Sequence, residues 1–187
     1  MRNRFTAIAV GVLSLAWSAV ASAQAVPQKP GPEHQKLAYF VGKWTAEGTV
    51  SESPFGPGGK TSSLDMCEWF EGKFAVVCRY DGKGPAGPMK GLGIMGYSAD
   101  QKVYTYYGLD NSAMITTSVA RGTVAGNIWT YTDESVVGGQ KVTSRYTLTV
   151  TSPDTYTFKW EMRGADGKWT TVGGGKTTRV KTGTSDE

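Results

Sequence analysis

Apolar and polar residues alternate strictly along two segments near the C-terminus, 140–150 and 155–163. Such alternation is typical of antiparallel strands that bury one face and expose the other to water. The predicted inward positions of the two segments are Val142, Ser144, Tyr146, Leu148, Val150, Tyr156, Phe158, Trp160 and Met162. The pattern therefore predicts a sheet with a single buried face.

Strand-length segments follow one another through most of the chain, separated by clusters of glycine, proline and other turn residues. They are 43–52, 60–70, 74–81, 89–98, 102–109, 113–122, 127–133, 140–150, 155–163 and 168–181. About ten short strands in even succession predict an all-β protein, either a single antiparallel up-and-down β-barrel or a sandwich. We favour the barrel. Two Gly/Pro-rich stretches, 53–59 and 82–88, are predicted to be loops at its rim.

A short helix is predicted over 32–41, before the first strand. Gly31 precedes it as the cap, Pro32 takes its first position, and Gly42 ends it. On a helix of 3.6 residues per turn, His34, Leu37, Ala38 and Val41 share one apolar side. We expect this helix to close one end of the barrel.

The segment around the two cysteines reads as a hairpin. A turn centred on Gly72 places Cys67 opposite Cys78 and Trp69 opposite Val76. A structural disulfide between Cys67 and Cys78 is therefore predicted. The opposite face of this hairpin is also apolar, with Leu64, Met66 and Phe70, so we expect it to be covered on both sides.

The N-terminal segment has two arginines, an apolar run and a small-x-small site, which is the pattern of a secretory signal peptide over 1–23. A linker over 24–31, one barrel domain over 32–181 and a flexible tail over 182–187 complete the predicted organisation. The protein is thus expected to be exported, to the periplasm or beyond, where disulfides form. Without Arg2 and Arg4 the formal charge falls from +4 to +2, which argues against a nucleic-acid partner. No later segment is apolar enough to span a membrane.

The order of these features carries a resemblance to a known superfamily. Gly42-Lys43-Trp44 opens the first strand directly after the short helix, and Arg179 lies on the last strand. This arrangement resembles the calycin superfamily, which includes lipocalins and fatty-acid-binding proteins. The resemblance implies that Trp44 packs across the closed end and that Arg179 lies over its ring, a favourable cation–π contact.

A closer similarity rests on five stretches of sequence. They are KPGPEH at 29–34, VGKWTAEG at 41–48, PFGPGG at 54–59, CEWF at 67–70 and DGKGPAGPMKGLG at 81–93. In these the chain resembles a family of exported bacterial proteins of unknown function with a calycin-like barrel. The similarity implies a fold and a compartment but no activity.

Candidate chemistry is sparse. His34 is the only histidine, which excludes a multi-histidine metal site. Nitrobindin-like haem barrels use a histidine late in the chain, and here none follows His34. We expect no metal and no cofactor, and we interpret His34 as a packing residue. The G-x-G-x-x-G match at 91–96 lies inside a predicted strand and not between a strand and a helix, so we reject a phosphate-binding role.

The positive signal is a set of aromatic residues that can line a cavity. The candidate ligand-binding residues are Tyr104, Tyr106, Met114, Tyr146, Tyr156, Phe158, Trp160, Glu68 and Arg79. A filled core is the alternative, but Ser, Thr and Gly at several inner positions favour a partly open cavity. For Glu68 and Arg79 we favour a structural ion pair, and we expect Asp133 and Glu134 to be turn residues.

Three functions remain open at this point. The leading one is a binding protein that holds a small, mostly apolar molecule. The second is an enzyme using Glu68, Arg79 and Tyr104 or Tyr106 as acid and base groups, and the third is an envelope protein acting through its rim loops. We favour binding over catalysis; the identity of the ligand and the oligomeric state stay open.

Overall fold

The computed structural model describes residues 29–53, 56–112, 118–137, 139–164 and 166–181. The predicted signal peptide and tail, and most of the predicted linker, lie outside these ranges. The described chain forms α1 (Pro32–Lys36), the 3₁₀ turns η1 (Leu37–Phe40) and η2 (Glu71–Lys73), and the strands β1 (Gly42–Val50), β2 (Gly59–Trp69), β3 (Ala75–Gly84), β4 (Gly87–Ser98), β5 (Val103–Asp110), β6 (Ala120–Ala125), β7 (Ile128–Val137), β8 (Gln140–Ser152), β9 (Thr155–Arg163) and β10 (Trp169–Arg179).

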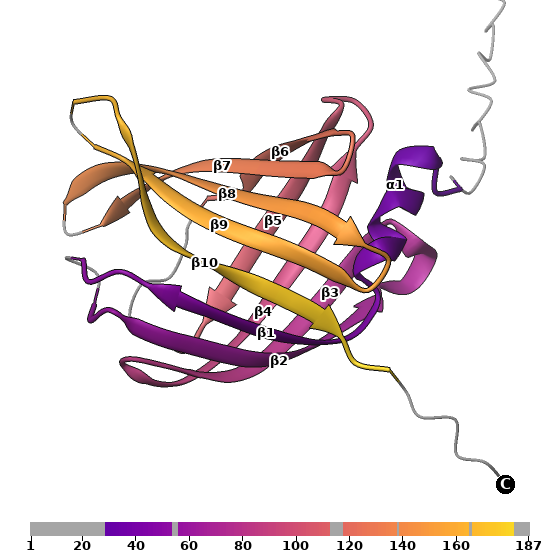
Figure 1. Cartoon of the computed structure of the whole chain (residues 1–187). Helices are drawn as coiled ribbons and strands as arrows, with labels where there is room; N and C mark the ends of the chain where they lie inside the picture. Colours follow the sequence, from indigo (N-terminus) through magenta and orange to yellow (C-terminus); the bar gives the residue numbers. More distant parts are fainter. Residues whose placement is uncertain (1–28, 54–55, 113–117, 138, 165, 182–187) are drawn as a thin grey trace, which may run out of the picture.

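The ten described strands form one closed antiparallel barrel in which each strand pairs with its neighbours in sequence, and β1 pairs with β10 (Figure 1). The predicted all-β, up-and-down barrel is confirmed, and the sandwich alternative is wrong. The predicted inward positions of β8 and β9 follow one face of their strands, and Leu148 among them is 4% exposed. The helix α1 lies at one end of the barrel.

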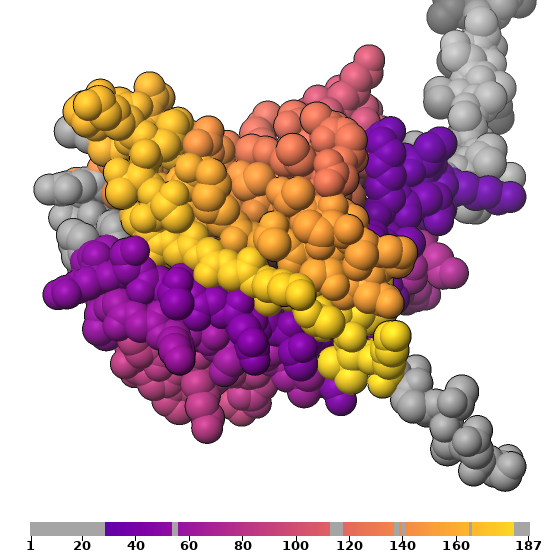
Figure 2. Space-filling model, viewed as in Figure 1, coloured from indigo at the N-terminus to yellow at the C-terminus, as the bar shows by residue number. Residues whose placement is uncertain are grey.

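Glycine makes the pairing of β1 with β10 possible. A Cβ on Gly48 would lie 2.6 Å from the carbonyl oxygen of Gly174, and one on Gly175 would overlap the backbone of Glu47. The ring of Phe158 lies over both positions, since its Cζ would be 2.9 Å from a Cβ on Gly48 and 2.7 Å from one on Gly175. In Figure 2, β10 fills the space between β1 and β9. The glycine run 173–175 therefore serves close strand packing.

The closed end of the barrel is built by α1 and η1. Gly31 is the N-cap, as predicted, but the helix tightens to a 3₁₀ turn after Lys36. Three residues per turn place His34, Leu37 and Phe40 on the inward side, and all three are buried. The prediction that Ala38 faces inward is wrong, because it assumed a regular α-helix.

The cysteine hairpin has the predicted register. Cys67 pairs with Cys78 in a disulfide, and Trp69 is opposite Val76. The prediction that the hairpin is covered on both sides is wrong, since Met66 and Phe70 on the outer face are 55% and 63% exposed.

Two predicted non-strand segments belong to the sheet. The expected rim loop 82–88 is strand on both sides, because β3 runs to Gly84, β4 begins at Gly87, and these two residues pair. The expected turn at Asp133 and Glu134 is also wrong, since both lie within β7. Closure of a barrel requires a continuous hydrogen-bonded ladder, and this requirement overrides the turn preference of glycine, proline and aspartate.

Candidate functional site

The closed end of the barrel is sealed by Trp44 and Arg179. The Arg179 guanidinium lies 4.0 Å from the centroid of the Trp44 ring, which confirms the predicted cation–π contact. It also donates to the carbonyl oxygens of Val41 and Tyr39, each at 2.7 Å. The indole Nε1 of Trp44 in turn donates to the carbonyl of Phe40 at 2.8 Å. The last strand is thereby bound to the chain that enters the first.

Tyr104, a predicted ligand contact, belongs to this closed end. Its hydroxyl donates to the carboxylate of Glu33 at 2.5 Å and to the Glu33 carbonyl at 3.1 Å, and the residue is 3% exposed. Burial and the hydrogen bond to Glu33 raise the pKa of the phenol. The Tyr104 hydroxyl therefore hydrogen-bonds to the helix and does not project into the barrel interior, which we call the lumen.

Above the closed end, tyrosines from several strands project into the lumen. Tyr106 on β5, Tyr146 on β8 and Tyr156 on β9 are three of the predicted candidates, and Tyr80 on β3 joins them. Burial raises the pKa of all four phenols. They are consequently protonated at neutral pH and able to donate hydrogen bonds.

Phe158 and Trp160 follow Tyr156 along the inward face of β9, as predicted, and both are partly buried. The Phe158 ring stacks on Tyr146, with centroids 6.0 Å apart and an angle of 24° between the rings. These two strands thus supply an apolar wall beside the tyrosine hydroxyls.

Asp65 was not among the predicted site residues. It faces inward on β2, between Trp44 of β1 and Tyr80 of β3 in the register, and the Ser63 hydroxyl donates to its carboxylate at 2.7 Å. Burial raises the pKa of Asp65, and the Ser63 hydrogen bond opposes that shift. Alternation along β2 puts Asp65 on the same face as Cys67 and Trp69, so the register predicted for the hairpin contained this signal.

The Asp65 carboxylate and the lumen tyrosines lie close enough to affect one another. After burial, the negative charge of Asp65 contributes to the raised pKa of Tyr80, Tyr106, Tyr146 and Tyr156. One carboxylate from β2 therefore faces hydroxyls contributed by β3, β5, β8 and β9. None of the ion pairs among the described residues includes Asp65.

The interior is not completely filled at the level of these tyrosines. Tyr146 points inward and is strongly desolvated, yet 38% of its surface is accessible. A side chain that is surrounded by protein and still accessible borders a void, so the accessible surface of Tyr146 faces the lumen. This accessible surface is consistent with the partly open cavity expected from the small inner residues.

Glu68 and Arg79 lie on the outside of the barrel. They form the predicted ion pair, with 2.9 Å between Arg79 Nη1 and Glu68 Oε1. The Arg79 side chain is 60% exposed and the Glu68 side chain 70% exposed. Because the alternation of β2 and β3 turns both outward, neither can contact a molecule in the lumen. Met114, another predicted contact, lies outside the described residues.

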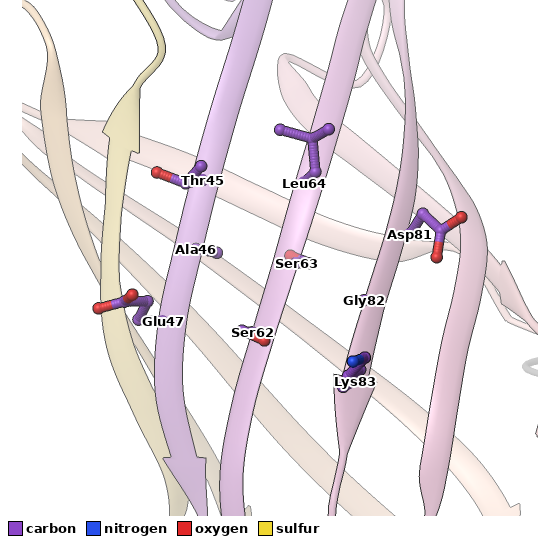
Figure 3. A pocket seen from close by; sticks show the side chains of 9 residues that line it. All are labelled: Thr45, Ala46, Glu47, Ser62, Ser63, Leu64, Asp81, Gly82 and Lys83. Atoms are coloured by element: carbon purple, nitrogen blue, oxygen red, sulfur yellow. The ribbon is translucent and has the colours of Figure 1, made fainter.

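The outer surface has a shallow depression of about 370 Å³ across β1, β2 and β3 (Figure 3). Its lining includes the outward-facing Glu47, Leu64 and Asp81. A neighbouring depression of about 620 Å³ extends toward Lys60 and Thr61. These hollows are grooves on the outer wall and are separate from the lumen.

The described residues contain no cluster of three or more His, Cys, Asp or Glu side chains able to hold a metal ion. Within the same ranges, no helix is long and apolar enough to cross a membrane.

A closed up-and-down barrel with a short helix at one end, and a cation–π pair joining its first and last strands, has the architecture of the calycin-like barrels. Residues 29–179 match the family described as "Protein of unknown function (DUF1579)". The chain belongs to this family. No curated protein matches it.

Two solved structures share the fold. Rv2717c from M. tuberculosis has a TM-score of 0.58 at 12% identity, over 82% of this chain and 100% of that one. The S-type phycobiliprotein lyase CPES from Guillardia theta has a TM-score of 0.58 at 11% identity, over 81% of this chain and 94% of that one. At such identities the similarity is one of fold alone.

Proposed function

We propose that the protein binds a small, mostly apolar molecule in the lumen, which it enters at the end of the barrel opposite α1. The observation that carries this proposal is the accessible surface of Tyr146, which lies inside the barrel and not on its outer wall. Burial of an apolar ligand there would remove apolar surface of both partners from water, at about 25 cal/mol per Å².

The proposed lining consists of Tyr106, Tyr146, Tyr156, Phe158 and Trp160, to which we add Tyr80. Ring faces and edges would provide apolar contact, and the protonated hydroxyls would orient any polar group of the ligand.

Binding is favoured over catalysis by the placement of the candidate acid and base groups. Glu68 and Arg79 are paired with each other on the outer wall, and the hydroxyl of Tyr104 is bound to Glu33. The raised pKa values of the lumen tyrosines make them hydrogen-bond donors and not bases. A phycobiliprotein lyase on the same fold shows only that such a barrel is compatible with more than one role.

We also propose that the protein works in an exported, oxidising compartment. The predicted signal peptide over 1–23 and the disulfide between Cys67 and Cys78 support this together, since structural disulfides are rare in reducing compartments.

The test of binding is a fluorescence titration with N-phenyl-1-naphthylamine, a neutral apolar dye that emits strongly out of water. We expect saturable binding that Ala46→Phe weakens at least about tenfold, because Ala46 faces inward on β1 and a phenyl ring there would occupy the lumen. Thr45→Phe is the matched control, since Thr45 is the outward neighbour on the same strand and is exposed.

Two results would count against the proposal: no saturable binding by the wild-type protein, or equal weakening by the two substitutions. Native mass spectrometry of the chain purified from its own cells would reveal a retained ligand directly as added mass.

A further inference from the structure

We propose that the ligand of the lumen is a cation, an apolar or aromatic body that carries a protonated nitrogen, with Asp65 as its counter-ion. The inference rests on the proposed function and specifies its ligand class. It follows from the charge distribution around the lumen, from the surroundings of Asp65 and from a buried tyrosine hydroxyl without a partner.

The charged side chains of the strands are divided unequally between the two faces of the barrel. The acidic residues Asp65, Asp110 and Asp133 occupy inward positions on β2, β5 and β7. The basic residues of the described strands occupy outward positions, apart from Arg179 at the closed end. Arg179 already contacts the Trp44 ring, three backbone carbonyls and Asp154. The lumen therefore has negative charge with no cation of the described chain free to balance it.

Of the three inward carboxylates, Asp65 is the one placed to hold a ligand. Asp133 accepts a hydrogen bond from the Ser144 hydroxyl and a second from Ser118, and Asp110 accepts one from the backbone N–H of Ser112 at the exposed end of β5. Asp65 lies beside Trp44 and Tyr80 in the register. Among the described residues it accepts one hydrogen bond, from the Ser63 hydroxyl, which leaves most of its acceptor sites unoccupied. A buried carboxylate without a cationic partner is costly, and a positively charged ligand would remove that cost.

The lumen tyrosines near Asp65 also suit a cationic ligand. Aromatic faces attract a cation within about 6 Å of the ring centroid, and phenolic oxygens accept hydrogen bonds from an ammonium group. One face of the Tyr146 ring stacks on Phe158, so a ligand would contact the part of Tyr146 that this stacking leaves accessible.

An independent observation comes from Tyr131, on the inward face of β7 opposite Tyr146. The residue is 3% exposed and its hydroxyl has no hydrogen-bond partner among the described residues. Its ring packs over Gly122, where a Cβ would come within 2.6 Å of it, and faces Tyr106, with ring centroids 6.0 Å apart. Buried hydroxyls are normally paired, so an interior with an unpaired hydroxyl and a carboxylate that has no cationic partner is suited to a ligand that supplies a polar group.

The experiment compares two dyes that share the dansyl group and the alkyl chain and differ at the terminal nitrogen. These are dansylcadaverine, whose amine is protonated at neutral pH, and its N-acetyl derivative, whose amide is neutral. We expect the wild-type protein to bind the cation at least about tenfold more tightly, the effect of one partly buried charge pair. Asp65→Asn keeps the size of the side chain and should abolish this preference while leaving the affinity for the neutral dye within about twofold.

The matched control is Asp81→Asn. Asp81 lies on β3, its side chain is 64% exposed on the outer wall and it pairs with Lys90, so its loss changes the net charge equally without touching the lumen. This variant should keep the preference for the cation. Circular dichroism spectra and melting curves of both variants confirm that they are folded.

The possible failures are distinct. Equal affinity of the wild-type protein for the two dyes, or an undiminished preference in Asp65→Asn, overturns the cation assignment and leaves the apolar binding site intact. Absence of binding by both dansyl dyes and by N-phenyl-1-naphthylamine overturns the proposed function, and the cation assignment with it.

Discussion

Arg179→Ala removes the side chain that connects the last strand of the barrel to the first. The guanidinium lies 4.0 Å from the centroid of the Trp44 ring and donates to the carbonyl oxygens of Val41 and Tyr39 at 2.7 Å each. It also pairs with Asp154 at 3.2 Å. Alanine would leave the indole uncovered and the two carbonyls without their charged donor.

The expected loss of stability follows from these contacts. Hydrogen bonds to a charged donor contribute about 1.5–3 kcal/mol each, and a cation–π contact about 0.5–2 kcal/mol. The pair with Asp154 adds little, because that side chain is 47% exposed. Arg179 itself is 25% exposed, so water can reach the vacated carbonyls and the lower end of each range applies. We therefore expect the free energy of unfolding to fall by about 4 kcal/mol.

Urea unfolding followed by tryptophan fluorescence measures this loss, and calorimetry should show a melting temperature lower by about 10 °C. Arg179→Lys keeps a cation near Trp44 but cannot reproduce the forked pair of hydrogen bonds, so we expect it to recover half of the loss or less. Arg163→Ala is the control. Among the described residues, the side chain of this exposed arginine at the end of β9 hydrogen-bonds only the Gly167 carbonyl, at 3.1 Å, so its loss should cost less than about 1 kcal/mol. If Arg179→Ala were no more destabilising than Arg163→Ala, the Arg179 contacts would not hold the closed end together.

Three further predictions concern the disulfide, the lumen carboxylate and the histidine. Replacing Cys67 and Cys78 together by alanine should lower the free energy of unfolding by about 2–3 kcal/mol, given their separation of 11 residues, and dithiothreitol should shift wild-type urea curves equally. Burial raises the pKa of Asp65 above its value in the unfolded chain, so the folded protein loses stability as the pH rises from the unfolded pKa through the folded one. Asp65→Asn should therefore raise the melting temperature at about pH 7 but not at about pH 3. A gain at both pH values would contradict the raised pKa. His34→Ala should lower the free energy of unfolding by about 1–2 kcal/mol, because His34 packs edge-on against two aromatic rings and accepts a hydrogen bond from the Gly31 N–H at 3.2 Å. The affinity for N-phenyl-1-naphthylamine should not change. Lost binding with unchanged stability would make His34 a ligand contact.

Much of the fold could be predicted because one-sided burial imposes a period of two. The inward residues of β8 and β9 followed from alternation alone, and the disulfide register followed from the length of one turn. The pair of Trp44 and Arg179 came from a resemblance and not from pattern, since residues so far apart in sequence leave no local signal.

The missed features share a different cause, namely that tertiary context decides them. Gly82 and Gly84 read as loop residues, but they belong to a ladder in which a Cβ on Gly82 would overlap the carbonyl of Ser62. Phe40 faces inward only because the helix tightens to a 3₁₀ turn. Asp65 was not among the candidate ligand contacts, although its position in the hairpin register turns it inward. Acidic residues mostly face water, and only the closed barrel shows what surrounds this one.

The pairing of β1 with β10 has a consequence for how the protein folds. The pairing of residues 44–50 with 173–179 closes a loop that spans almost the whole domain. The chain loses conformational entropy on that closure before the strand contacts compensate for it. A nascent chain that still lacks its last strand has two open sheet edges, and no arginine over its first tryptophan. We expect the native state to form only after the C-terminal residues leave the ribosome, at the rates of milliseconds to seconds typical of chains with high contact order.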